Sequence, residues 1–288
     1  MPIAAPYLTK KRIDHFISEA LAEDIGPGDY SSLSAVPNGA ISTAILKIKD
    51  NGIIAGLKLA QYIFEKVDPE LRIKFFKKDG DIIHSGELAF EVKGNAISIL
   101  SAERLVLNCL QRMSGIATKT NHFQNLIAHT KTKLLDTRKT SPNSRLIEKW
   151  AVLIGGGKNH RFALYDMIML KDNHVDYAGG ISKALQDAKK YLQTNQLNLK
   201  IEIETRNLDE VKEVLSTRLA DVIMLDNFSL ENTRLALALI NGSIITEASG
   251  NVTENSIVGI AETGVDFISV GALTHSYKSL DLSLKAVV

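Results

Sequence analysis

The sequence predicts a protein of the α/β class whose second part is an incomplete (β/α) barrel. From about residue 131 onward, short apolar runs alternate with longer segments of helical period. The runs are apolar throughout, which is typical of strands buried on both faces of a parallel sheet with helices outside it. Six such strand–helix units are visible, fewer than the eight of a closed barrel. An incomplete or elaborated barrel is therefore the first interpretation, and a doubly wound open sheet is the second.

Bulk properties narrow the class of protein. A length of 288 residues suits one large or two modest domains, and a net charge of +1 predicts neither nucleic-acid nor membrane partners. The single cysteine, Cys109, excludes intramolecular disulfides and multi-cysteine zinc sites, and its apolar setting predicts core packing. The sequence shows no secretory signal and no apolar run of membrane-spanning length. We therefore expect a cytoplasmic protein.

The first hundred residues predict a small sheet-and-helix domain, followed by two helices that Gly115 separates. The pattern predicts a hairpin around the Asp50-Asn51-Gly52 break, because flanking residues alternate with period two. The expected elements, in order, are a helix at 11–23, a turn-rich loop at 24–32, the hairpin at 42–56, a helix at 57–67, strands at 71–76 and 88–95, and helices at 99–114 and 118–130.

In the barrel part, several residues are typical of positions where helices begin or end. Asn207 with Glu210 predicts a capped helix with a capping-box acid, and Ser229 and Thr253 are candidate N-caps. Pro142 suits the first turn of a helix that ends at glycines 155–157. The expected strands are 133–135, 167–170, 201–204, 221–225, 244–246 and 267–270, and the other helices are 181–193, 208–218, 230–240 and 254–264.

The residues that follow these strands are polar or small, and their charges are segregated. In parallel α/β folds the working face lies at the carboxyl ends of the strands. Cations come from the early strands, carboxylates from the middle ones and small residues from the last two. The strand ends are 136–139, 171–174, Glu204, 226–227, 247–251 and 271–272. Ser249-Gly250-Asn251, just before the Thr253 cap, has the composition of a phosphate-binding loop.

This segregation favours a pocket for a highly anionic small molecule. Taken singly, a lysine at a strand end is usually a surface charge, and His160 or His174 is more often structural than catalytic. No third ligand makes a zinc site with them. Together, however, cations and two carboxylates suit a phosphorylated sugar, because carboxylates hold ribose hydroxyls or a Mg²⁺ that bridges pyrophosphate oxygens. Negative charge also stabilises the oxocarbenium-like centre that departing pyrophosphate leaves.

The chain resembles the quinolinate phosphoribosyltransferase family, also called nicotinate-nucleotide pyrophosphorylase (carboxylating). The resemblance runs from about Ser101 to Ser276, and the early EDIGPGDYSS also looks like this family. The motifs occur in the family's order, and they are AERLVLNCLQRMSGIAT, DTRKTSPNSRLIEKWAV, GGGKNHRFALYD, LKDNH, IEIET, IMLDNF, EASGN and ISVGALTHS.

The resemblance implies a reaction and a set of site residues. Phosphoribosyl pyrophosphate and quinolinate would give nicotinate mononucleotide, CO₂ and pyrophosphate, as in de novo NAD biosynthesis. Lys139, Lys171, Glu204 and Asp226 would be catalytic, and Mg²⁺ would sit on the pyrophosphate near the two acids without direct protein ligands. The implied substrate-binding residues are Arg104, Arg138, Lys139, His160, Arg161, Lys171, Glu204, Asp226, Ser249, Gly250, Asn251, Gly271 and His275.

The resemblance also implies an architecture and an assembly. It implies an N-terminal α/β sandwich over 1–114, joined by the C-terminal segment 275–288, and an open, about seven-stranded α/β barrel over 115–274. The subunit would form a homodimer, or a larger assembly, in which Arg104 enters the neighbour's active site.

Four other functions stay open at this stage. They are a phosphoribosyltransferase that takes nicotinate without decarboxylation, a molybdenum-transport-associated relative, a non-catalytic anion sensor, and a barrel aldolase with Lys171 as its Schiff base.

Overall fold

The computed structural model describes residues 5–287, which form two compact units. The N-terminal unit contains the chain up to residue 121, the segment 140–156 and the chain from 272 onward. The barrel unit contains residues 122–139 and 157–271. The domain boundaries expected near residues 114 and 275 stay predictions.

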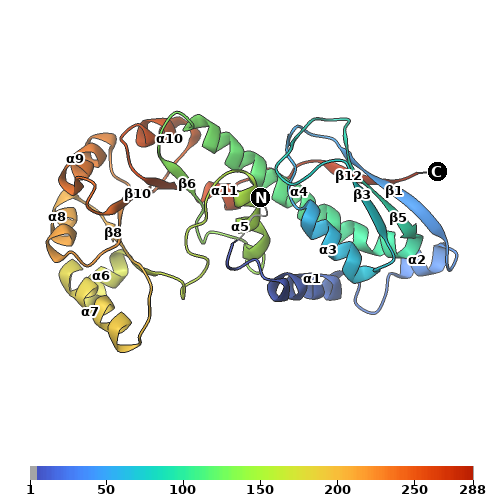
Figure 1. Cartoon of the computed structure of the whole chain (residues 1–288), viewed down its shortest axis with the longest axis horizontal. Helices are drawn as coiled ribbons and strands as arrows, with labels where there is room; N and C mark the ends of the chain where they lie inside the picture. Colours follow the sequence, from blue (N-terminus) through green and yellow to red (C-terminus); the bar gives the residue numbers. More distant parts are fainter. Residues whose placement is uncertain (1–4, 288) are drawn as a thin grey trace. The chain divides into compact units, whose positions relative to one another are not determined.

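The N-terminal unit is built on a four-stranded antiparallel sheet in the order β12-β1-β5-β3, beside a two-stranded sheet of β2 and β4. Helix α3 lies along the larger sheet, where the rings of Phe64 and Phe90 meet edge to face at 5.9 Å (Figure 1). The strands are β1 Ile41–Ile48, β2 Gly52–Ile53, β3 Arg72–Phe75, β4 Ile82–Ile83, β5 Leu88–Asn95 and β12 Leu282–Ala286; the helices are α1 Lys10–Asp24, α2 Tyr30–Ala35, α3 Leu57–Val67, α4 Ala96–Leu126, α5 Arg145–Ile154 and α11 Ala272–His275.

The predicted hairpin at 42–56 is wrong. Its first strand, β1, pairs with β5 on one edge and with β12 on the other, so both of its hydrogen-bonding edges are occupied. The residues after Asn51 form β2, which pairs with β4 instead. A period-two pattern shows that both segments are strands, but it does not show which strand each one pairs with.

The predicted division of one helix into two at Gly115 is also wrong, because α4 continues through this glycine to Leu126. A Cβ atom at Gly115 would lie 2.3 Å from the backbone oxygen of Lys278. The glycine therefore allows the chain after α11 to approach the helix backbone, and it does not end the helix. Cys109, on the same helix, is buried as predicted, and burial raises the pKa of its thiol to about 12.

We expect Gly115→Ala to lower the free energy of unfolding by about 2 to 3 kcal/mol, the usual cost of overpacking against an unyielding contact. Urea unfolding followed by circular dichroism measures the change. Gly259→Ala, in α10 (Glu254–Ala261), is the matched control, since its Cβ would meet only the flexible Leu230 side chain at 3.1 Å. Alanine there should be neutral or stabilising. Equal effects of the two substitutions would contradict the packing role.

The barrel unit is a six-stranded parallel sheet in the order β6-β11-β10-β9-β8-β7, with its helices outside (Figure 1). All six predicted strands are present. The strands are β6 Lys133–Leu135, β7 Ile168–Leu170, β8 Ile201–Thr205, β9 Val222–Asp226, β10 Ile245–Ser249 and β11 Phe267–Ser269; the helices are α6 Asp172–Ala178, α7 Ile181–Thr194, α8 Leu208–Thr217, α9 Leu230–Ile240 and α10.

The sheet is the predicted open barrel. Strands β6 and β7 are its edges, and within residues 5–287 no pairing joins them. At the outer side of β6, Lys158 makes a single parallel bridge to Leu135, at the place of a seventh strand. The resemblance implied about seven strands, and six strands plus this bridge agree with an unclosed barrel.

Alternation along the strands separates the two faces of this sheet. Ile201, Ile203, Ile223 and Leu225 belong to the apolar cluster that packs against the outer helices. Residues one position away, such as Glu204, therefore point to the inner face. The registers align these inner positions from strand to strand, since Glu204 and Glu247 both pair with Met224.

The three predicted helix N-caps are confirmed, and two other predicted signals for helix ends are wrong. Asn207, Ser229 and Thr253 are N-caps, and the first two accept hydrogen bonds from their own helices. Pro142 does not open α5, which begins at Arg145, because Asn143 in between has a φ of +61°. The carboxylate of Glu210 accepts from the backbone of Arg206, one residue before the cap, so no capping box forms there. The short helices α2, α6 and α11 were not predicted.

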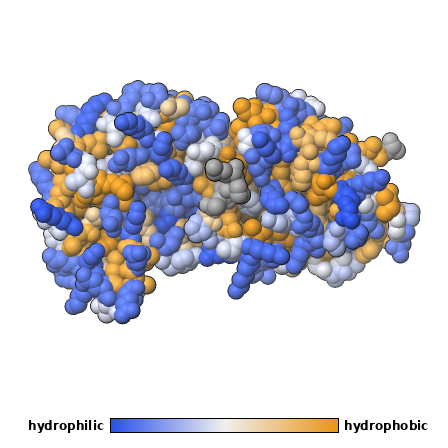
Figure 2. Space-filling model, in the orientation of Figure 1, coloured by the Kyte–Doolittle hydropathy of each residue, from blue (hydrophilic) through white to orange (hydrophobic). Residues whose placement is uncertain are grey.

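Within residues 5–287, no helix has the length and apolar character that a membrane span needs. Hydrophilic and apolar residues interleave over the face of the molecule shown in Figure 2.

Candidate active site

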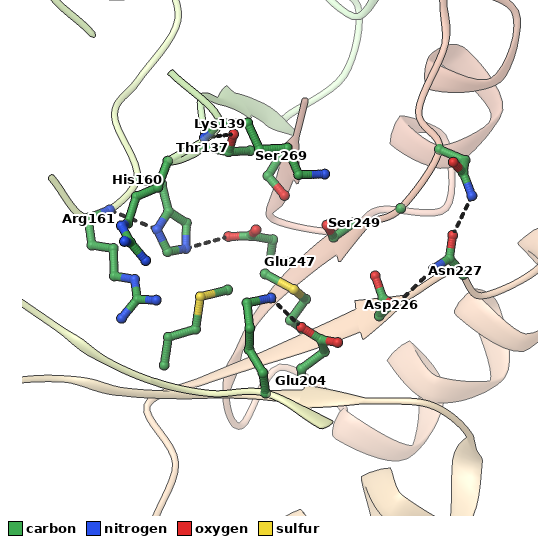
Figure 3. Close-up of a pocket in the computed structure, with 16 residues that line it drawn as sticks. Thr137, Lys139, His160, Arg161, Glu204, Asp226, Asn227, Glu247, Ser249 and Ser269 are labelled. Atoms are coloured by element: carbon green, nitrogen blue, oxygen red, sulfur yellow. Dashed lines mark hydrogen bonds and ion pairs between the residues drawn. The ribbon is translucent and has the colours of Figure 1, made fainter. Parts of the chain in front are cut away.

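A cavity of about 530 Å³ opens at the carboxyl ends of the barrel strands. Every residue that lines it belongs to the barrel unit. Figure 3 shows Lys139, His160 and Arg161 on one side of it and Glu204 and Asp226 on another. The lining residues are Thr137, Arg138, Lys139, His160, Arg161, Met169, Lys171, Glu204, Met224, Asp226, Asn227, Glu247, Ser249, Gly250, Asn251 and Ser269.

The structure brings most of the predicted site residues together. Those that line the cavity are Arg138, Lys139, His160, Arg161, Lys171, Glu204, Asp226, Ser249, Gly250 and Asn251. Three predicted residues are not among its lining. Arg104 is exposed on α4, His275 is exposed at the end of α11, and Gly271 follows β11. The role of each predicted residue in binding or catalysis stays a prediction.

A buried carboxylate positions one side of the cavity. This side, here called the cationic side, is lined by Arg138, Lys139, His160 and Arg161. Asp136, at the end of β6, is fully buried and accepts hydrogen bonds from Asn159 Nδ2 at 2.6 Å and from the backbone of His160 at 2.9 Å. These bonds hold the loop before Arg161 against the strand end. The cations of this loop and of the loop after β6 therefore face one cavity.

Two arginines on this side have unsatisfied donors. Arg138 Nε and Arg161 Nε are buried and have no hydrogen-bond partner within residues 5–287. Burial lowers the pKa of Arg161, and the nearby charge of Arg138 lowers it further. Buried donors in native proteins are almost always satisfied. An anionic ligand would both accept these hydrogen bonds and relieve the repulsion.

On the acidic side of the cavity, which Glu204 and Asp226 line, one carboxylate forms an ion pair with a lysine. Lys171 Nζ lies 2.7 Å from Glu204 Oε2, and the side chain of Glu204 is only 9% exposed. His174 Nδ1 accepts from the backbone N–H of Lys171 at 3.0 Å, so this histidine positions the lysine backbone. His174 does not line the cavity, in agreement with a structural role.

Hydrogen bonds of two asparagine side chains join the loops after β9 and β10. Asn251 Nδ2 donates to Asn227 Oδ1 at 3.0 Å, and Asn227 Nδ2 donates to Asp226 Oδ2 at 2.8 Å (Figure 3). Gly250 has a φ of +98°, and a Cβ there would lie 2.2 Å from Asn227 Oδ1. The glycine therefore leaves room for the amide that orients Asp226.

Two buried carboxylates near the cationic side had no predicted role. Glu202 and Glu247 are 0% and 2% exposed, and His160 Nε2 lies 2.8 Å from Glu202 Oε2 and 3.5 Å from Glu247 Oε2. Burial, and then the charge of Glu202, raise the pKa of Glu247 to about 8. The signal for Glu202 was its spacing of two from Glu204 on one strand, and the same spacing relates Glu247 to Ser249.

Comparison with known proteins assigns the chain to a family. The sequence matches the models of the N-terminal and C-terminal domains of quinolinate phosphoribosyl transferase over residues 29–114 and 116–285. The chain belongs to the quinolinate phosphoribosyltransferase family. Its resemblance to this family, stated from the sequence motifs, is confirmed.

Relatives of this chain come from plants and bacteria. The chloroplastic nicotinate-nucleotide pyrophosphorylase (carboxylating) of Arabidopsis thaliana is 50% identical over 285 residues, which are 93% of this chain and 81% of that protein. A protein of Bacillus subtilis (strain 168), named as a probable nicotinate-nucleotide pyrophosphorylase (carboxylating), is 42% identical over 96% of this chain and 92% of its own length.

Solved structures of the family share the fold. The nicotinate-nucleotide pyrophosphorylase of Francisella tularensis superposes with a TM-score of 0.89 at 42% identity, covering 99% of this chain and 98% of that one. Human nicotinic acid phosphoribosyltransferase is 13% identical, with a TM-score of 0.58 over 98% of this chain and 74% of that one, and it shows a likeness of fold alone.

The cavity contains two groups of oxygen and nitrogen atoms that could contact a cation. Glu204 and Asp226 each keep one carboxylate oxygen outside the hydrogen bonds described, which suits contact with a hydrated Mg²⁺ that a substrate carries. The ligand atoms of His160, Glu202 and Glu247 lie within 4.8 Å of one another, the spacing of a divalent-metal group. Glu202 already accepts from His160, so we interpret the second group as a hydrogen-bonded network.

Proposed function

We propose that this chain transfers the phosphoribosyl group of phosphoribosyl pyrophosphate to quinolinate and releases pyrophosphate and CO₂. The product is nicotinate mononucleotide, and the reaction belongs to de novo NAD biosynthesis. The observation that carries the proposal is the pair of buried arginine donors without partners, in one cavity with the carboxylates of Glu204 and Asp226. Membership of the family and the names of its close relatives support it.

The cationic side suits the acceptor substrate. Quinolinate has two neighbouring carboxylates on a pyridine ring, and planar guanidinium groups bind carboxylates with paired hydrogen bonds. Arg138 and Arg161 supply those groups, and the exposed Lys139 adds charge to the same lining. We assign the two carboxylates of quinolinate to these residues.

The acidic side suits the ribosyl donor. Glu204 and Asp226 would accept hydrogen bonds from the ribose hydroxyls and stabilise positive charge at the anomeric carbon as pyrophosphate leaves. Mg²⁺ on the pyrophosphate would neutralise the charge of the leaving group. Lys171, held by Glu204 at 2.7 Å, would stabilise the same charge from the protein side. The 249–251 loop would take the 5′-phosphate.

The chemistry needs no covalent enzyme intermediate. The pyridine nitrogen forms a bond to the anomeric carbon, and the bond from that carbon to pyrophosphate breaks. The nitrogen is then a pyridinium. When the bond to the 2-carboxylate breaks, its electron pair stays on C2, next to this positive charge. CO₂ leaves, and C2 takes a proton from water.

The assembly and location belong to the proposal as well. Arg104 is exposed and absent from the lining of the cavity, in line with a role in the active site of a neighbouring subunit of a homodimer. We place the enzyme in the cytoplasm, although the plant relatives carry chloroplastic or mitochondrial names. Sedimentation and cell fractionation test these two statements.

One incubation tests the function. The protein is mixed with quinolinate that carries ¹⁴C in the 2-carboxylate, phosphoribosyl pyrophosphate and Mg²⁺, and we expect nicotinate mononucleotide and labelled CO₂ in equal amounts. Nicotinate replaces quinolinate in a parallel sample, which should give little product. A folded protein that makes no product from quinolinate would overturn the proposal. Product from nicotinate alone would indicate a phosphoribosyltransferase that does not decarboxylate.

A further inference from the structure

His160, Glu202 and Glu247 form a buried cluster, here called the His160 cluster, whose members come from three segments. Glu202 lies on β8, Glu247 lies on β10, and His160 lies in the loop after Lys158. Glu202 Oε1 and Glu247 Oε1 are buried and have no hydrogen-bond partner within residues 5–287. One oxygen of each carboxylate and a ring nitrogen of His160 lie within 4.8 Å of one another, and two buried carboxylates at this separation cannot both be ionised without a large cost.

The hydrogen bonds of the imidazole define its tautomer. The backbone N–H of Arg161 donates to His160 Nδ1 at 2.8 Å, so Nδ1 carries a lone pair and no hydrogen. Nε2 therefore carries the hydrogen and donates to Glu202 Oε2. In this arrangement the imidazole has one hydrogen, on Nε2, and Glu202 Oε2 is its acceptor.

The charges that face the cluster come from every neighbouring segment. On the loop side, Arg161 interacts favourably with Glu202 and is repelled by Arg138. On β10, Glu247 faces Glu202 and His160, and on β11 it faces the hydroxyl of Ser269.

The remaining charged groups of the cavity are already paired with one another or lie on other strands. Glu204 is on β8, where it pairs with Lys171. Asp226 is at the end of β9, and Lys139 follows β6. Arg161, a residue of the substrate pocket, is the arginine whose charge interacts with Glu202, so the charge of the two buried carboxylates affects how cationic that pocket is.

We propose that Glu202 and Glu247 hold one proton between them and act as positioning residues for the binding of the dicarboxylate substrate. Ionised Glu202 fixes the imidazole of His160, which in turn holds the backbone of Arg161. Protonated Glu247 forms a wall of the cavity that bears no charge and does not neutralise the arginines. This inference rests on the proposed function, because it assigns the quinolinate carboxylates to Arg138 and Arg161.

The raised pKa of Glu247 agrees with a proton on Glu247 rather than on Glu202. Because burial and Glu202 raise the pKa of Glu247 to about 8, its carboxyl is protonated at neutral pH. Above that pH a second buried negative charge appears in the cavity wall. It repels a dicarboxylate, so quinolinate binding should weaken as the pH rises.

Stability should change with pH in the same window. In the unfolded chain Glu247 ionises near its ordinary pKa of 4.5, whereas in the folded chain it keeps its proton to about pH 8. Its contribution to stability is therefore complete below about pH 4.5 and falls as the pH rises to about 8. Glutamine cannot ionise, so Glu247→Gln should gain stability relative to the wild type across this window.

The first experiment measures the KM for quinolinate of the wild type and of Glu247→Gln from about pH 6 to about pH 9.5, around the raised pKa. We expect the wild-type KM to rise about tenfold per pH unit above the pKa of Glu247, and the KM of the variant to rise much less. The KM for phosphoribosyl pyrophosphate should follow the same course in both proteins. Glu231→Gln, at an exposed position on α9, is the matched control and should behave as the wild type does. Identical profiles for the wild type and Glu247→Gln would overturn the proposal.

The second experiment uses Glu202→Gln, which keeps the shape but loses the anionic acceptor of His160. We expect its KM for quinolinate to rise at least about tenfold, with a change in the KM for phosphoribosyl pyrophosphate below about threefold. A purely structural role would lower the melting temperature and affect both substrates alike. Equal effects on the two KM values would therefore also count against the proposal.

A third measurement does not depend on turnover. Infrared difference spectra of the wild type should show a protonated carboxyl group that disappears on titration through about pH 8, and Glu247→Gln should lack it. If the wild type makes no nicotinate mononucleotide but shows this carboxyl, the proposed function has failed and the shared proton stands. If it makes the product but shows no such carboxyl, the shared proton has failed alone.

Discussion

Replacing Lys171 by alanine should lower kcat/KM for phosphoribosyl pyrophosphate by about 10²- to 10³-fold, the usual effect of removing one preorganised charge from a reaction centre. Lys171 follows β7 directly, so the strand determines where its side chain points. Its ammonium group lies 2.7 Å from Glu204, which is nearly buried. The substitution removes the cation and also leaves a nearly buried carboxylate without its partner. Both changes weaken the stabilisation of departing pyrophosphate.

Steady-state kinetics and circular dichroism at one temperature separate lost chemistry from lost folding. Lys183→Ala is the matched control, because Lys183 forms an ion pair of the same length, 2.7 Å, with Asp187 on the exposed face of α7. That pair is worth little in water, so the control should keep near wild-type kinetics and stability. Arg138→Ala should lose turnover as Lys171→Ala does. Near-normal turnover in both cavity variants would show that the cavity is not the active site.

The residues at the strand ends could be predicted from the apolar patterns of the strands and helices together with the parallel order of the strands. Apolar runs identify the strands, the parallel order brings their carboxyl ends to one edge, and the residues that follow are then neighbours. Lys171, Glu204 and Asp226 lie far apart in the sequence, yet this rule is enough to place them in one cavity. The types of residue at the strand ends then indicated the chemistry of the site.

Features that depend on contacts distant in sequence were not predictable. Gly115 has the local properties of a helix end, and only the approach of Lys278 explains why the helix continues. Nothing local shows that β1 pairs with β12 near the end of the chain. Alternation puts Glu202 on the inner face, but the hydrogen bond to His160 depends on a loop that Asp136 holds in place.

Gly250→Ala should raise the KM for phosphoribosyl pyrophosphate by about 10²-fold or more, since it disturbs several contacts to the donor at once. Two effects combine at this position. The backbone φ of +98° is strained for any residue with a Cβ, and that Cβ would lie 2.2 Å from Asn227 Oδ1. Asn227 must then move, and the amide that donates to Asp226 at 2.8 Å moves with it. The loop assigned to the 5′-phosphate and the carboxylate assigned to the ribose are therefore displaced together.

Gly264→Ala separates the two effects. Gly264 lies in the same unit and has a similar φ of +92°, but a Cβ there would meet nothing within 4 Å. Backbone strain alone should cost about 1 kcal/mol of stability in both variants, with the kinetics of Gly264→Ala unchanged. The KM for quinolinate should change far less than the KM for the donor in Gly250→Ala, because Arg138 and Arg161 lie in other loops, one after β6 and one after Lys158. If both alanine variants bind the donor equally well, Asn227 does not orient Asp226, and the two loops act independently.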